Sequence, residues 1–240
     1  MDVVYPIIQN EDNEELKYSL RSLEENFIFD KVFIIWHKPS WIQNVVHIEF
    51  DDSIVPFWSY NTSKKLLHIC ENNDISEDFV FMADDIYFLE KIENLWYYKK
   101  WDMCEYLEFL KSKWPLTQHW VVIERTMRQY SHLGNIGCFE THTPIIYNRS
   151  KMREILLEYN LGDIAKRSVY CIENNITWED LITYNYLWSE ILNDCKYYNN
   201  WSLMIKKWQQ FLSSMNFESE EIKKFLQRKF NKPSRFEIIF

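Results

Sequence analysis

The chain has 240 residues, of which 47% are hydrophobic and 18% aromatic, so it can bury a large core. Its 3 glycines are too few for a Walker loop or a Rossmann fingerprint, and neither pattern occurs, which excludes these nucleotide-binding modes. The net charge of −9 argues against a non-specific nucleic-acid binder, because such binding depends on neutralising phosphates. A basic stretch at residues 220–240 keeps a local nucleic-acid surface open, although a solvated helix face is the simpler interpretation.

The 5 cysteines are scattered and form no CxxC pair, which indicates a reducing compartment rather than a disulfide framework or a zinc site. The N-terminal residues turn acidic at once, unlike a signal peptide. No run of about 18 apolar residues occurs. We therefore expect a cytoplasmic protein without a membrane span.

The first ninety residues alternate between short apolar runs and segments with helical spacing. The runs predict buried strands at residues 2–8, 31–36, 44–50 and 78–83. Helical spacing predicts helices at 13–27 and 61–72, the second with Asn61 or Thr62 near its N-cap. This order predicts an α/β sandwich with a mostly parallel sheet.

The rest of the chain is predicted to be mainly helical. A loop with a strand is expected within residues 134–150, and Ser150 is a possible N-cap of the helix that follows. The expected helices are 99–114, 116–133, 150–160, 177–192, 202–215 and 219–230. We expect a single domain, residues 1–240, with an α/β core at 1–100 and a helical part at 101–240 packed on it.

Asp84 and Asp85 follow the fourth predicted strand, within the apolar run "FVFMADDIYFL". Two adjacent carboxylates are costly to bury without partners. In a parallel sheet, ligands bind beyond the carboxyl ends of the strands, which is where this pair is predicted to lie. A divalent Mg²⁺ or Mn²⁺ would remove the repulsion, with substrate phosphates completing its shell. The alternative is a turn in which both aspartates cap backbone amides and face water.

Several segments, in order, resemble conserved regions of the Stealth family of sugar-phosphate transferases. "EELKYSLRS" with "PSW" is similar to the second region, and "SEDFVFMADDIYFL" to a strand that ends in an acidic pair. "WSYNTSKKLLHI" resembles a Phe-Asn-Ser helix start, and "ETHTPIIYNRSKMREI" resembles the third region. Ala83 stands where the family tends to place an asparagine before the pair.

The resemblance implies a GT-A-like nucleotide-diphospho-sugar transferase core, with a metal held by Asp84 and Asp85. Residues 1–100 would then bind the nucleotide sugar and residues 101–240 would form the acceptor side. The reaction is either transfer of a sugar or, as in the Stealth family, transfer of a hexose 1-phosphate. A non-catalytic carbohydrate-binding protein on the same fold is a further alternative.

The resemblance also suggests roles for individual residues, each with a plainer alternative. Arg21 and Lys17, one helical turn apart, would contact the donor diphosphate, or lie on a solvated face. Asn61 would bind the donor at a helix start, or be an ordinary cap. His142 would remove the proton of the acceptor hydroxyl, or be a structural loop histidine. The remaining assignments are Glu140, which would orient His142 or bind metal, and Arg149 and Lys151, which would meet phosphate or be ordinary exposed basic residues.

Aromatic residues after the predicted strand ends, Trp36, Trp41, Trp58 and Tyr60, are candidates for stacking on a nucleobase or sugar. We expect a UDP-sugar as donor. The acceptor is either a surface glycan or a hydroxymethylated base of phage DNA. The nucleotide, the sugar, the stereochemical outcome and the oligomeric state are left open by the sequence.

Overall fold

The structure is a computed structural model that describes residues 1–51, 58–99, 101–113, 117–159, 162–180, 183–184, 201–206, 209–214 and 220–238. The predicted mostly parallel sheet is confirmed: five strands lie in the order β3-β2-β1-β4-β9. The first four run parallel and β9 runs antiparallel to β4. The strands are β1 (Asp2–Ile7), β2 (Val32–Trp36), β3 (Val46–Ile48), β4 (Asp78–Phe81) and β9 (Ile145–Asn148).

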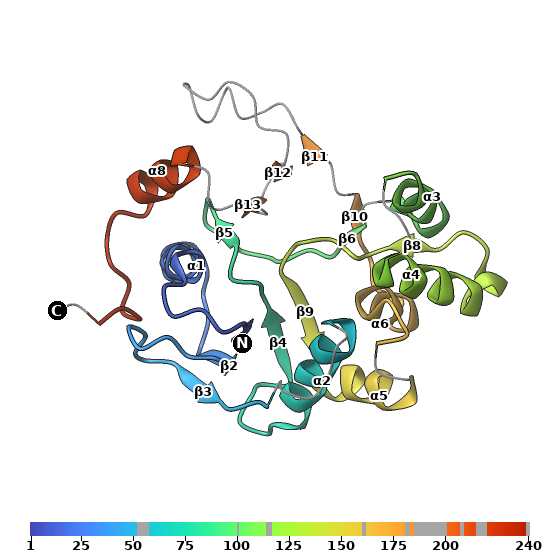
Figure 1. Cartoon of the computed structure of the whole chain (residues 1–240), viewed down its shortest axis with the longest axis horizontal. Helices are drawn as coiled ribbons and strands as arrows, with labels where there is room; N and C mark the ends of the chain where they lie inside the picture. The colour runs from blue at the N-terminus through green and yellow to red at the C-terminus, as the bar shows by residue number, and fades with distance from the viewer. Residues whose placement is uncertain are drawn as a thin grey trace.

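Both faces of this sheet are covered, so its strands are apolar on both sides. On one face, Val3 and Tyr5 pack in a cluster with helix α1 (Glu14–Asn26). On the other, Val4 and its neighbours pack in a cluster with α2 (Trp58–Glu71) and α5 (Arg149–Glu158). Figure 1 shows α1 on one side of the sheet and α2 with α5 on the other.

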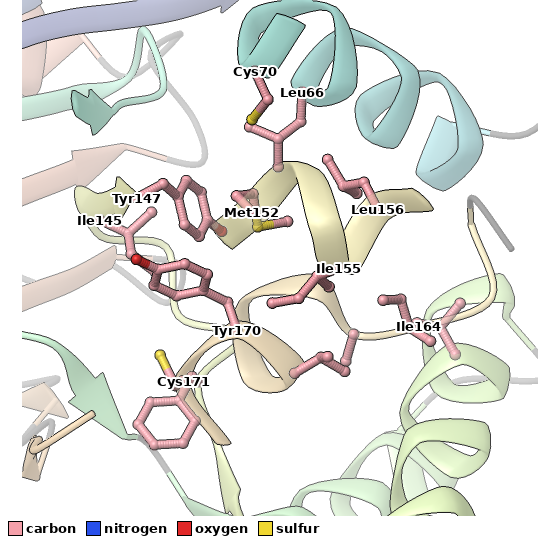
Figure 2. Packing of buried hydrophobic residues seen from close by; sticks show 14 of the residues in the cluster. Leu66, Cys70, Ile145, Tyr147, Met152, Ile155, Leu156, Ile164, Tyr170 and Cys171 are labelled. Carbon is pink, nitrogen blue, oxygen red and sulfur yellow. The ribbon is translucent and has the colours of Figure 1, made fainter. Parts of the chain in front are cut away.

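The predicted helices of the middle of the chain form. They are α3 (Met103–Lys113) and α4 (Gln118–Gln129), followed by a short 3₁₀ turn at Ser131–Leu133. An additional helix, α6 (Lys166–Glu173), was not predicted. Figure 2 shows α5 and α6 packed together, with Tyr147, Met152 and Tyr170 in the shared core. Helices α3, α4 and α6 lie beyond β9, on the side of the sheet away from β3 (Figure 1).

Two predicted helices are wrong where the structure describes them. The segment predicted as a helix at 202–215 contains β12 (Trp201–Lys206) and β13 (Gln209–Ser214), which pair with each other. β13 also pairs with β5 (Ile86–Phe88), so an available strand edge overrides helical spacing. Within 177–192, β10 (Glu179–Asp180) and β11 (Thr183–Tyr184) are strands, and 185–192 lie outside the described residues.

Two predicted N-caps also differ from the structure. Asn148, not Ser150, caps α5, because its side chain accepts a hydrogen bond from the amide of Lys151. Helix α2 is already formed at Trp58, so Asn61 lies in its first turns rather than at a cap. The remaining short strands are β6 (Tyr98–Lys99), β7 (Trp101–Asp102) and β8 (Gly137–Cys138).

The C-terminal segment returns to the first half of the chain. Helix α8 (Glu220–Lys229) forms as predicted, and the residues after it run beside α1 (Figure 1). Backbone hydrogen bonds join Gln43 to Phe236 and Ile238 to Trp41. Within the part of the chain that the structure describes, no helix is both long and apolar enough to cross a membrane.

Candidate active site

The acidic pair lies at the carboxyl edge of the sheet. β4 ends at Phe81, and the amide of Met82 still bonds to the carbonyl of Val4 in β1. Asp84 and Asp85 come next, before β5 begins at Ile86. Their side chains are partly buried at the edge where parallel sheets bind ligands.

His142 reaches Asp85 from a loop far away in sequence. Because β9 is antiparallel, Ile145 at its start pairs with Phe81 at the end of β4, which brings the preceding loop to the acidic pair. The Nε2 atom of His142 lies 2.7 and 2.9 Å from the two carboxylate oxygens of Asp85. The His142 side chain is 46% exposed and that of Asp85 only 14%. The imidazole therefore lies over a mostly buried carboxylate and can still meet a ligand.

Asp84 has a different partner. The Nδ2 atom of Asn13 donates a hydrogen bond to Asp84 at 2.7 Å. The Oδ1 atom of the same asparagine accepts from the amide of Leu16 and so caps α1. A single buried side chain therefore connects the start of α1 to the acidic pair.

A third carboxylate, Glu15, interacts electrostatically with Asp84 and Asp85. Burial, and then the charges of Asp84 and Asp85, raise the pKa of Glu15 to about 7. Burial raises the pKa of Asp84 too, and Asp85 adds to this rise, whereas the hydrogen bond from Asn13 opposes it. The local negative charge is thus only partly compensated, which is the electrostatic condition for binding a cation.

The donor set fits a hard divalent cation whose shell is completed by a substrate. Asp84 and Asp85 offer carboxylate oxygens, the ligands that Mg²⁺ and Mn²⁺ prefer. Among the described residues, no group of three or more His, Cys, Asp or Glu side chains is arranged to hold a metal by itself. Such a cation would therefore depend on phosphate oxygens from a ligand as well as on the protein.

A pocket of about 340 Å³ lies beside the His142 side chain. Ala83 and Ile86, which flank the acidic pair, form part of its wall. His119, Glu140, Lys166 and Arg167 also line the pocket, and we call Lys166 and Arg167 its basic wall. The pocket thus connects the edge of the sheet with the start of α6.

Glu140 does not contact His142 through any hydrogen bond found in the described part of the chain. Its Oε1 atom accepts from the amide of Ser168 at 3.1 Å and from the Ser168 hydroxyl at 3.3 Å. Asp85 is instead the carboxylate that orients His142. Glu140 shares the pocket wall with His142, and its predicted catalytic role stays a prediction.

Arg21 and Lys17 lie in a second charged cluster. Arg21 donates through Nε and an Nη atom to both carboxylate oxygens of Glu237, at 2.7 and 2.6 Å, and also to the carbonyl of Phe230. The Lys17 ammonium lies 3.7 Å from Glu237. This arrangement holds the C-terminal segment against α1, so these cations already have an anion of the protein as partner.

Arg149 lies at the opposite ends of the strands from the acidic pair. Asn148 at the end of β9 pairs with Asp78 at the start of β4, because the two strands are antiparallel. Arg149 then bonds to Asn73 at 2.6 Å and lies 3.3 Å from Glu77. The structure therefore does not bring Arg149, or Lys151 two residues later, together with Asp84.

Of the remaining candidates, Trp36 lies at the carboxyl ends of the strands and Asn61 lies near the start of α2. Thr62, next to Asn61, lines the pocket. Trp36 ends β2 with a φ of 82°, a strained conformation for a bulky residue, and the Lys65 ammonium lies 3.8 Å from its ring centre. The Trp41 indole donates to the Glu11 carbonyl. The side chain of Trp58 lies outside the described residues.

Sequence reasoning did not select Asn13, Lys166 or Arg167 as site residues. Nothing in the sequence indicates the contact of Asn13 with Asp84, 71 residues away. The adjacent basic pair in "DIAKRSVY" was a visible signal, but without a predicted α6 it had no place in the fold.

Three solved structures with similar chain traces are glycosyltransferases. The galactosyltransferase LgtC, in complex with donor and acceptor sugar analogues, has a TM-score of 0.44 and 11% identity over 75% of this chain and 67% of its own. An active-site mutant of LgtC gives 0.43 and 11% over 74% and 66%. Mouse xyloside xylosyltransferase 1, apo form, gives 0.40 and 10% over 81% and 92%. The chain thus spans about two thirds of the LgtC structures.

No known protein-family profile matches the chain, and no curated protein matches it by sequence. The resemblance to the Stealth family therefore stays a hypothesis. At 10–11% identity the solved structures assign no role to any residue here. Roles must come from the geometry of the chain itself.

Proposed function

We propose that the protein is a metal-dependent glycosyltransferase that moves a sugar from a nucleotide-sugar donor, most simply a UDP-sugar, to an acceptor hydroxyl. One observation carries the proposal. An incompletely compensated acidic pair at the carboxyl edge of the sheet, Asp84 and Asp85, directly contacts a partly exposed histidine, His142, that borders a pocket. This arrangement places a cation-binding group, a base and space for a substrate next to one another.

Asp84 and Asp85 would hold Mn²⁺ or Mg²⁺. When bound, the cation supplies positive charge to the diphosphate that departs from the sugar. Asn13 fixes the orientation of Asp84 through its hydrogen bond. Glu15 adds negative charge to the same region, which strengthens the attraction for a cation.

His142 is the base that we assign to the acceptor hydroxyl. Its Nε2 atom faces Asp85, so a neutral imidazole carries its proton there and leaves the Nδ1 lone pair to accept another. As the hydroxyl oxygen bonds to the anomeric carbon, the bond from that carbon to the diphosphate breaks and the hydroxyl proton moves to Nδ1. The Asp85 carboxylate then stabilises the imidazolium.

The pocket next to His142 is where the acceptor would lie. The donor diphosphate would lie on the acidic-pair side, and the two substrates would meet at His142. Orientation of both substrates, together with charge stabilisation, accounts for catalysis in such a site. The acceptor would be a sugar or glycan, because a net charge of −9 disfavours binding to the phosphates of DNA.

A donor screen tests this proposal. UDP-, GDP- and CMP-sugars are added to the protein with Mn²⁺, with Mg²⁺ or with EDTA, and the melting temperature is recorded. We expect one nucleotide class to raise the melting temperature only when a metal is present. If no nucleotide sugar does so with either metal, a non-catalytic carbohydrate-binding protein becomes the better account.

The nucleotide released during turnover identifies the bond that breaks. With a UDP- or GDP-sugar, transfer of a sugar releases a nucleoside diphosphate, whereas transfer of a sugar phosphate, as the Stealth resemblance implies, releases a nucleoside monophosphate. We expect the diphosphate. Chromatography of the products with Mn²⁺ present separates the two reactions.

A further inference from the structure

The pocket beside His142 has more positive than negative charge in its wall. Lys166 and Arg167 line it, while Glu140 is the one carboxylate in the lining among the described residues. That carboxylate already accepts two hydrogen bonds from Ser168. This single carboxylate compensates the charge of the basic wall only in part.

Arg167 keeps donors that no described residue uses. The Nε atom of Arg167 is buried and lacks a hydrogen-bond partner within the described residues, although an Nη atom donates to the Thr143 carbonyl. Burial lowers the pKa of Lys166, Glu140 acts to raise it, and Arg167 lowers it again. A guanidinium carries five N–H donors, so the other donors of Arg167 can meet an oxyanion in the pocket that this residue lines.

The position of the pocket indicates which substrate would occupy it. His142 lines the pocket, whereas neither Asp84 nor Asp85 belongs to the described lining. The acceptor must reach the base, while the donor diphosphate must reach the acidic pair. The group that faces Lys166 and Arg167 would then belong to the acceptor.

We infer that the basic wall binds an anionic group, a phosphate or a carboxylate, carried by the sugar acceptor. The inference rests on the proposed function for the identity of the acceptor side. Guanidinium and ammonium groups form strong charge-assisted hydrogen bonds with both kinds of oxyanion. The enzyme would then select acidic over neutral sugars as acceptors, since a neutral sugar leaves the basic wall without an anion.

Oxyanion binding is tested first without any sugar. Inorganic phosphate is titrated into the full chain in EDTA at constant ionic strength, and the melting temperature is followed. We expect phosphate to stabilise the wild type, and Lys166→Gln to need about tenfold more phosphate for the same shift, since it loses one charge-assisted bond. Lys91→Gln, an exposed lysine, is the charge-matched control and should behave as the wild type. Lys166→Arg should retain most of the response.

A second substitution in the basic wall and a check of folding keep the test valid if one variant misfolds. Arg167→Gln removes the second cation, and circular dichroism before titration shows whether each variant is folded. If folded Lys166→Gln and Arg167→Gln both respond to phosphate as the wild type does, the inference is overturned. It is also overturned if Lys91→Gln loses the response as strongly as they do.

A second arm separates the acceptor from the donor diphosphate as the source of the anion. UDP with Mn²⁺ is titrated into the wild type and Lys166→Gln by calorimetry. We expect equal affinities, together with a roughly tenfold higher KM for a glucose 6-phosphate or glucuronate acceptor in Lys166→Gln. A matching loss of UDP affinity would assign the basic wall to the donor and overturn the acceptor assignment. If UDP fails to bind the wild type, a UDP-sugar donor is excluded while the phosphate arm still decides the basic wall.

Discussion

Two clusters of charged side chains, both selected from the sequence, differ in whether their charges are balanced. Around Asp84 and Asp85, burial and mutual repulsion raise the pKa of Asp84 and of Glu15. Around Glu237, burial acts to raise the pKa, but Arg21 and Ser234 outweigh it and hold the pKa below its ordinary value. The first cluster has charge available for a ligand, and the second uses its charge to hold the fold together.

This difference explains why residue type and helical position alone were poor guides to the role of Arg21. A guanidinium one turn from a lysine is equally suited to a diphosphate or a carboxylate. The carboxylate that it meets, Glu237, is 216 residues away in sequence. Whether a cation is available to a substrate depends on such distant partners.

The largest expected effect on activity is at the first cluster, around Asp84 and Asp85. Asp85→Asn removes a charge from the metal site and the partner of His142, so we expect sugar transfer with Mn²⁺ to fall about a thousandfold. The melting temperature without ligand should stay equal or rise, because repulsion is relieved. Transfer rates that remain within about tenfold of the wild type would contradict the metal-site assignment.

At the second cluster, around Glu237, we expect a loss of stability rather than of activity. Arg21→Met leaves Glu237 buried without its partner, and we expect the free energy of unfolding to drop by about 3 kcal/mol. Urea denaturation measures this change. The affinity for UDP with Mn²⁺ should be unaffected in the folded variant. A stable Arg21→Met protein that no longer binds UDP would instead support a donor-binding role for Arg21.

His142 joins the acidic cluster to the pocket. His142→Gln keeps a hydrogen bond to Asp85 but removes the base, so we expect kcat to fall about a hundredfold with little change in donor affinity. Steady-state kinetics with varied donor and acceptor separates the two parameters. His132→Gln, on an exposed 3₁₀ turn, is the matched control and should retain full activity. A loss of donor affinity with kcat retained would make His142 a binding residue.

The two clusters also predict opposite responses to pH. The pKa of Glu15 is raised to about 7, so its destabilising charge develops as pH rises from about 4.5 through 7. The pKa of Glu237 is lowered, so the stability from its ion pair is lost as pH falls through that pKa. Glu15→Gln should therefore stabilise the protein at pH 8 by about 1–2 kcal/mol, discounted for partial exposure, and have little effect at pH 5.

Urea denaturation of Glu15→Gln at both pH values checks this prediction. Glu14→Gln, the preceding residue on the exposed side of α1, serves as the control. Stabilisation of the same size at pH 5 and pH 8 would show that the charge of Glu15 is not the cause.

The sheet, and the position of Asp84 and Asp85 at the carboxyl ends of its strands, could be predicted because their signals are local. Apolar runs of strand length and the interrupting Asp84 and Asp85 lie within one stretch of sequence. The β12 and β13 hairpin could not be predicted, since it depends on pairing with β5, more than a hundred residues earlier. The contact of Asn13 with Asp84, and the meeting of Lys166 with His142 across one pocket, likewise depend on tertiary packing.

Binding of Mn²⁺ tests the central claim most directly. Free Mn²⁺ is measured by electron paramagnetic resonance while the ion is titrated into the protein with UDP present. The account predicts about one bound Mn²⁺ per chain in the wild type and in Arg21→Met, and none in the Asp84→Asn, Asp85→Asn double variant. Equal Mn²⁺ binding by the double variant and the wild type would contradict the assignment of the acidic pair as the metal site.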